Sequence, residues 1–284
     1  MTEYRYSRIG QGVWRAVAKR TWYIVAFTAL SVAAALLLPA VPQPAEYHDF
    51  ADHRTMLGIE NFLDVASNVG FLLAGIVGLV VVLRPLTRFE LASERWPYAI
   101  FFVGLLLTAA GSAYYHLLPD NERLFWDRLP MTIAFMSLIA AQIVDRISVR
   151  AGLALLAPML LVGVASVVYW LATERAGAGN LVPYGILQAY TVIMLLVIAL
   201  SHPARYTRGN DVYWVFAAYG IAKILETFDK QFLAIGNVVS GHTLKHVAAA
   251  IAGFIVLRML VLRVPRGAEA ERGERGVAET AGPS

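Results

Sequence analysis

Long apolar runs alternate with short polar segments along almost the whole chain. Eight runs are long enough to span a membrane, at about 22–40, 62–83, 97–118, 129–147, 151–171, 184–201, 212–232 and 241–263. About 20 apolar residues cross a hydrocarbon core of about 30 Å. A helix satisfies its own backbone polar groups where no water is present. The pattern therefore predicts an all-α, polytopic integral membrane bundle.

The composition excludes an ordinary soluble enzyme. Of 284 residues, 58% are apolar and 15% are charged, whereas roughly 25% is usual for soluble domains. The formal net charge is +4, but the basic residues lie in loops and tails and not on one soluble face, so no nucleic-acid partner is predicted. Because the chain has no cysteine, any metal must be held by histidine and carboxylate.

Lysine and arginine are unevenly divided between the two ends of the predicted spans. One side has 17 of the 24, namely Arg5, Arg8, Arg15, Lys19, Arg20, Arg84, Arg88, Arg95, Arg146, Arg150, Arg205, Arg208, Arg258, Arg263, Arg266, Arg272 and Arg275. The other side has five, Arg54, Arg123, Arg128, Arg175 and Lys230, and the remaining two, Lys223 and Lys245, lie inside predicted spans. The positive-inside rule then predicts that both termini are cytoplasmic.

Three regions follow from this pattern. Residues 1–61 form a cytoplasmic N-terminus, an extra span and an acidic outer loop; residues 62–263 form a seven-helix core; and residues 264–284 form a disordered cytoplasmic tail rich in Glu, Arg, Gly and Ala. The first run also fits a secretory signal peptide, since a basic region precedes it and Ala40 and Ala45 follow it. Its apolar stretch of about 18 residues exceeds the 7 to 15 usual for such segments.

Polar residues cluster at the ends of three spans. Ionisable groups inside a membrane are costly, so each needs a reason to be there. Ser112 and His116 end the third span, and their spacing of four places them on one helix face. Asp127 follows a short turn, which should bring it close to His116. His242 and His246 open the last span with the same spacing.

All these residues fall on the extracytoplasmic side of the predicted topology. Three neutral imidazoles with an open fourth position are a catalytic zinc arrangement. Zinc activates water and polarises a carbonyl, a nearby carboxylate manages protons, and a hydroxyl stabilises an oxyanion. Two alternatives stay open. The histidines could be hydrogen-bonded packing residues, or two of them could ligate haem. The haem alternative leaves Ser112 and Asp127 without a role.

At these residues the chain resembles the alkaline ceramidase family, part of a larger group of seven-span membrane hydrolases that includes the adiponectin-receptor-like proteins. The family pattern is a Ser, a His four residues later, an Asp eleven after that, and a distant His-x-x-x-His. The segment Asn61-Phe62-Leu63-Asp64-Val65-Ala66-Ser67-Asn68 is similar to the opening of the family's first core helix. The resemblance covers roughly residues 49–263 and implies a seven-span zinc hydrolase, preceded here by one extra span.

Eukaryotic members of that family have a calcium site of acidic residues before the first core helix. The corresponding region here contains Asp49, Asp52, Glu60 and Asp64. The register does not match, because Asn61 stands where an acidic residue is expected. The resemblance therefore does not predict calcium dependence, and these carboxylates are interpreted as a solvated loop.

The seventh span contains a second group of charges, Lys223, Glu226, Asp229 and Lys230. Spacings of three and four predict that Glu226 pairs with both Lys223 and Lys230. We interpret the group as a structural salt-bridge network, with contact to a substrate head group as the alternative. Asp145 and Arg146, at the cytoplasmic end of the fourth span, are interpreted as an interfacial pair.

The first functional hypothesis is a zinc-dependent amidohydrolase that cleaves a ceramide-like or other N-acyl lipid to a fatty acid and a free amine. His116, His242 and His246 would ligate zinc, Asp127 would shuttle protons and Ser112 would stabilise the oxyanion. A membrane sensor or lipid-binding protein with a structural metal is the second hypothesis, and a proton-coupled transporter using Glu226 and Asp229 is the third. Abundant Ala and Arg with few Lys suggest a bacterial inner membrane, with the site on its periplasmic face; the oligomeric state is not predicted.

Overall fold

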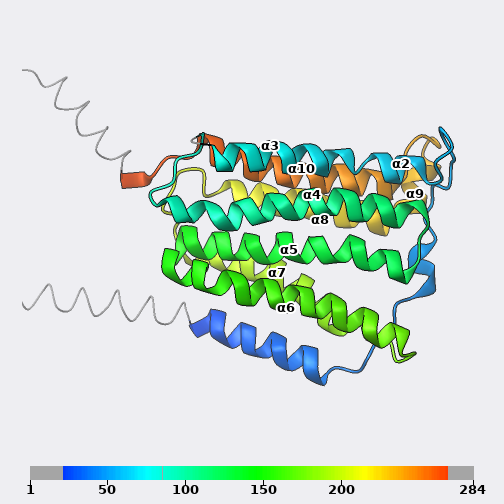
Figure 1. The fold of residues 1–284 in the computed structure, drawn as a ribbon, viewed down its shortest axis with the longest axis horizontal. Coiled ribbons are helices and arrows are strands. Elements are labelled where there is room, and N and C mark those ends of the chain that lie inside the picture. The colour runs from blue at the N-terminus through cyan, green and yellow to red at the C-terminus, as the bar shows by residue number, and fades with distance from the viewer. Residues whose placement is uncertain (1–21, 85, 268–284) are drawn as a thin grey trace, which may run out of the picture.

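The computed structural model describes residues 22–84 and 86–267, and all the regular secondary structure in this part of the chain is helical (Figure 1). A helix at Trp22–Leu37 is followed by η1 (Ala45–His48), α2 (Phe62–Ala66), α3 (Val69–Leu83), η2 (Ala92–Glu94), α4 (Arg95–Leu117), α5 (Asn121–Arg146), α6 (Val149–Arg175), α7 (Val182–Ser201), α8 (Asp211–Thr227), α9 (Asp229–Ala234) and α10 (Gly241–Leu262). The predicted all-α polytopic bundle is confirmed.

Six helical segments in the described part are long and apolar enough to cross a membrane: Phe62–Leu83, Ala92–Leu117, Asn121–Arg146, Val149–Arg175, Val182–Ser201 and Gly241–Leu262. The other two predicted spans correspond to the shorter apolar helix Trp22–Leu37 and to α8, which has 17 residues. The long helices lie roughly along one common axis (Figure 1). Large apolar side chains such as Leu161 and Leu200 face outward, as expected where lipid replaces water.

The predicted end of the seventh span, at residue 232, is wrong. Helix α8 stops at Thr227, and α9 begins at Asp229. The carboxylate of Asp229 accepts hydrogen bonds from the backbone N–H groups of His242, at 2.7 Å, and Ala51, at 2.9 Å. These contacts hold Asp229 at the end of the bundle, where the chain turns toward α10.

The second predicted span is divided into α2 and α3 at Ser67 and Asn68. The Asn68 amide donates to the carbonyl of Asp64 at 2.9 Å, which replaces part of the backbone bonding at the break. Asn61 precedes α2 in a left-handed conformation, with φ of 49°, and its amide donates to the carbonyl of His116 at 2.9 Å. The divided helix is therefore bonded to the end of α4.

Helices α4 and α5 pack as antiparallel neighbours across the short turn that joins them. Gly111 allows this close approach, because a Cβ there would lie 1.9 Å from the carbonyl oxygen of Trp126. Helix α10 packs against α8 and α3. Together these contacts bring the end of α4, the start of α5 and the start of α10 to one end of the bundle.

The extra N-terminal helix packs against α7. Phe27 stacks on Tyr190, with ring centroids 5.7 Å apart, and Thr28 hydrogen-bonds the hydroxyl of Tyr190 at 3.0 Å. The predicted disordered tail is wrong for its first residues, since the N–H of Thr207 donates to the carbonyl of Val264 and the N–H of Arg266 to that of Arg205. Residues 268–284 lie outside the described part of the chain.

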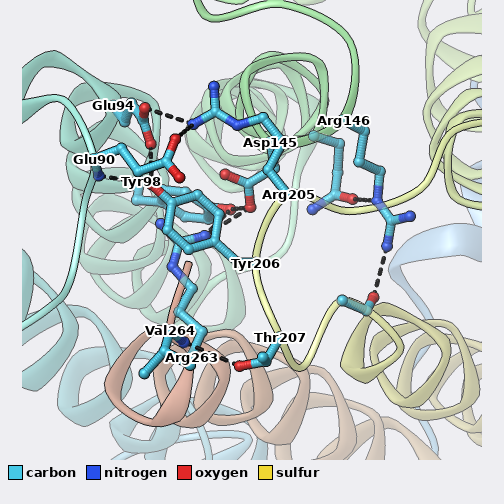
Figure 2. A network of polar contacts seen from close by, with 12 residues as sticks. Glu90, Glu94, Tyr98, Asp145, Arg146, Arg205, Tyr206, Thr207, Arg263 and Val264 are labelled. Carbon is cyan, nitrogen blue, oxygen red and sulfur yellow. Dashed lines mark hydrogen bonds and ion pairs between the residues drawn. The ribbon is translucent and has the colours of Figure 1, made fainter. Parts of the chain in front are cut away.

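A buried charged network closes the end of the bundle opposite the histidines (Figure 2). Arg263 is 1% exposed, pairs with Asp145 at 2.7 Å and stacks over the ring of Tyr206, 4.1 Å from its centroid. The predicted pairing of Asp145 with Arg146 is wrong, because Arg146 donates instead to loop carbonyls, including that of His202 at 2.8 Å. The network ties the end of α10 to α5 and to the loop after α7.

We expect Arg263→Met to destabilise the protein by about 3 to 5 kcal/mol, because it leaves the Asp145 carboxylate buried without its partner. Adding Asp145→Asn should recover part of this loss by removing the unpaired charge. The unfolding midpoint in detergent measures both effects. A double variant no more stable than Arg263→Met would contradict this account.

Candidate metal centre

Three histidines from two helices converge on one point. His116 lies in the last turn of α4, while His242 and His246 lie in the first turns of α10. All three are buried, and one nitrogen of each lies within 4.8 Å of the others. The Nε2 atoms of His116 and His242 are 3.3 Å apart. The structure therefore brings together the three residues that the sequence predicts as metal ligands.

The spacing of the histidine nitrogens fits a metal ion. Zinc–imidazole bonds of about 2.0 to 2.1 Å place the ligands of a tetrahedral site about 3.3 Å apart, which is the separation found between His116 and His242. An all-imidazole donor set suits zinc, copper, iron or nickel.

Ser67 orients one of the three histidines. Its hydroxyl lies 2.8 Å from Nδ1 of His246 and 3.0 Å from the carbonyl oxygen of Asp64. This contact engages Nδ1 and leaves Nε2 of His246 available to a metal. The sequence pattern gives Ser67 no role of its own, although its spacings from Asp64 and Asn61 place the three residues on one side of the short α2 segment.

We expect Ser67→Ala to weaken zinc binding by about 10- to 100-fold while the fold is kept, because outer hydrogen-bond partners fix the orientation of metal-bound histidines. Competition with a chelator of known affinity measures the change. Ser31→Ala is a matched control, since Ser31 makes a comparable bond to a helix carbonyl, of Phe27, in the N-terminal helix. Equal zinc affinity of Ser67→Ala and the parent would contradict this role.

The start of α10 is fixed by a buried carboxylate. Ser240 caps the helix by accepting from the N–H of Thr243 at 3.0 Å. Oδ1 of Asp64, which is fully buried, accepts from the hydroxyls of Thr243 and Ser240. A negative charge is favourable at the positive end of a helix. Asp64 therefore positions the turn that carries His242 and His246.

The outer loop is only partly the solvated acidic segment that the sequence predicts, because the side chains of Asp49 and Glu60 are exposed whereas Asp52 and Asp64 are buried. Besides Asp64, Asp52 is buried, at 2% exposure, and pairs with Arg54 at 2.6 Å. The hydrogen bonds from Arg54 hold the pKa of Asp52 below its ordinary value. Asp49 is exposed and pairs with Lys230 at 2.7 Å. These acids have separate partners because the loop folds back over the end of the bundle.

Phe50 covers the histidines from this loop. Its ring centroid lies 4.6 Å from that of His116 and 4.4 Å from that of His242. Nearby, Nδ1 of His48 hydrogen-bonds the Tyr115 hydroxyl at 2.9 Å. The outer loop thus shields the cluster from the water beyond the bundle. The sequence does not mark Phe50 as a residue that covers the histidines, because nothing in the loop pattern distinguishes it from the neighbouring aromatic residues.

A cavity of about 290 Å³ reaches the cluster from inside the bundle. Ser112, Asp127 and His246 all line it. Most of the remaining wall is apolar and includes Phe71, Phe101, Leu105, Leu138, Leu195 and Phe216. The predicted serine and aspartate therefore share one apolar cavity with one of the histidines.

Charged residues occupy another part of this cavity wall. Glu226 pairs with Lys223 at 2.6 Å, as predicted, and with Lys245 of α10 at 3.1 Å. The predicted pairing of Glu226 with Lys230 is wrong, because α8 ends before Lys230 and the lysine turns to the outer loop. Arg128 also lines the cavity.

Comparison with known proteins adds no assignment, because neither a known protein family nor a curated protein matches the chain.

Proposed function

We propose that this protein is a zinc-dependent integral membrane amidohydrolase that cleaves ceramide-like N-acyl lipids to a fatty acid and a free amine. The observation that supports the proposal best is a cluster of three buried histidines beside an apolar cavity that also contains Ser112 and Asp127. The cavity offers an acyl chain an apolar wall inside the bundle, and the polar residues lie where its amide would be.

Zinc, when bound, supplies a Lewis acid that polarises a carbonyl and increases the acidity of water. His116, His242 and His246 would hold it. Asp127 would accept a proton from water and pass it to the leaving amine. The Ser112 hydroxyl would donate a hydrogen bond to the developing oxyanion.

The apolar cavity would provide most of the substrate affinity. Each buried CH₂ group contributes about 0.8 kcal/mol, so a long acyl chain can bind without a precise fit of its head group. We further propose that the histidine end faces the extracytoplasmic side, in a bacterial inner membrane. The support is the charge bias, since the opposite end has the arginines of the buried network.

A membrane sensor with a structural metal is a second candidate, and one observation favours it. Structural zinc sites are closed to solvent, and Phe50 packs directly over two of the histidines. The transporter hypothesis has less support, because Asp229 accepts backbone hydrogen bonds from His242 and Ala51 and Glu226 is paired with two lysines.

Fatty-acid release from an N-acyl sphingoid base and from N-acyl ethanolamine tests the enzyme proposal. The zinc-loaded protein in lipid–detergent micelles should release fatty acid, and a chelator should stop the release until zinc is restored. If the folded protein retains zinc but releases no fatty acid from neutral or anionic N-acyl lipids, the proposal is wrong and the sensor hypothesis is favoured.

A further inference from the structure

Arg128 is a buried cation in the cavity wall with an unused hydrogen-bond donor. It follows Asp127 in α5 and is 4% exposed. Its Nη2 donates to the side-chain oxygen of Gln43 at 2.7 Å. Its Nη1 is buried without a hydrogen-bond partner in the described structure. An unmade bond from a buried charged donor is costly, so this nitrogen has a strong preference for an acceptor.

Aromatic rings surround the Arg128 guanidinium but do not satisfy that donor. Its central carbon lies 4.4 Å from the ring centroid of Trp170, 4.9 Å from that of Tyr184 and 5.2 Å from that of Tyr47. Rings in such positions stabilise the cation through its faces. They hold the guanidinium in place while Nη1 stays unpaired.

Arg128 also lacks an anionic partner. Within the described residues, no carboxylate oxygen lies within 4.0 Å of its guanidinium nitrogens, whereas Lys223 and Lys245 share Glu226. The charged residues of the cavity wall are Asp127, Arg128, Lys223, Glu226 and Lys245. Three are cations and two are anions, so their formal net charge is +1. Buried charge is unfavourable unless it is paired. A bound divalent metal would make the excess larger.

From this excess of positive charge and the unpaired Arg128 donor, we propose that the preferred substrate is an N-acyl lipid with an anionic group, a carboxylate or a phosphate, on the amine side of the scissile amide. The amide cleavage itself rests on the function proposed above. The acyl chain would occupy the apolar wall, so the amine side would stay with the polar residues near Asp127. Arginine suits both anions because its planar fork donates two parallel hydrogen bonds.

Three substrates with the same acyl chain test the proposal: N-palmitoyl glycine, N-palmitoyl phosphoethanolamine and neutral N-palmitoyl ethanolamine. For the zinc-loaded parent, kcat/KM for at least one anionic lipid should exceed that for the neutral lipid by about tenfold or more. The preferred anionic lipid shows whether the group is a carboxylate or a phosphate. Equal kcat/KM values for all three lipids would overturn the proposal.

Arg128→Gln should reduce the ratio of kcat/KM for the preferred anionic lipid to kcat/KM for the neutral lipid by about tenfold. The substitution keeps a hydrogen-bond donor but removes the charge. Arg175→Gln is the matched control: Arg175 is exposed at the same end of the bundle and pairs with Glu122, and this variant should keep the parent ratio. If Arg128→Gln lowers kcat/KM equally for all three lipids at full zinc content, Arg128 is structural and the proposal is wrong. If that variant does not fold, Arg128→Lys decides: the ratio should fall as the fork is lost, and an unchanged ratio would overturn the proposal.

Failure of the amide chemistry can be separated from failure of this inference. If the zinc-loaded parent hydrolyses none of the lipids, their direct binding to that protein is compared. Tighter binding of an anionic lipid, weakened in Arg128→Gln, would support the anion site and reject the hydrolase. Equal binding of charged and neutral lipids would reject the anion site.

Discussion

Replacing His246 by alanine should remove most of the zinc from the purified protein, whereas the parent should contain about one zinc per chain. His246 is one of three buried imidazoles, and its orientation is set by Ser67. Without it, two ligands remain and the site becomes an incomplete donor set. Elemental analysis of detergent-solubilised protein, prepared without a chelator, measures the zinc content of both forms.

His53→Ala is the matched control for this experiment. His53 lies at the same end of the bundle, is exposed, and approaches Asp49 at 3.6 Å without joining the cluster. This variant should retain the parent's zinc. Circular dichroism and size-exclusion profiles establish that each variant is folded. A folded parent without zinc, or equal zinc in the parent and in His246→Ala, would contradict the three-histidine site.

Asp127→Asn should lower turnover of an N-acyl lipid by about 10² to 10⁴-fold while leaving zinc content and folding unchanged. Asparagine has nearly the same shape as aspartate, but it cannot take a proton from water. Asp127 is not one of the clustered ligands, so its charge is not needed to hold the metal. Initial rates of fatty-acid release, with zinc measured on the same samples, test both parts.

Asp120→Asn controls for the loss of a carboxylate at this end of α5. Asp120 caps the helix by accepting from the backbone N–H of Arg123 at 2.7 Å, and asparagine is an equally good cap. This variant should keep both zinc and turnover. Full turnover in Asp127→Asn would exclude Asp127 as the proton carrier, and parallel loss of zinc and turnover would assign it a structural role instead.

The sequence by itself determined the helical class, most of the spans and the three histidines of the candidate metal centre. These features depend on local periodicity: an apolar run of sufficient length must form a helix in lipid, and a spacing of four places two side chains on one face. His242 and His246 are related in this way. The charge bias and the span count then placed His116 at the same end without any knowledge of packing.

Only the tertiary structure decided how distant segments meet. Besides the predicted Lys223, Glu226 pairs with Lys245 of another helix. Asp64 is buried under the start of α10, and Phe50 folds over the cluster from a loop. Sequence spacing cannot show such contacts, because they depend on where α8 ends and how the outer loop returns. The unpaired donor of Arg128 also depends on tertiary structure. That Nη1 has no hydrogen-bond acceptor can be seen only when the positions of all the neighbouring side chains are known.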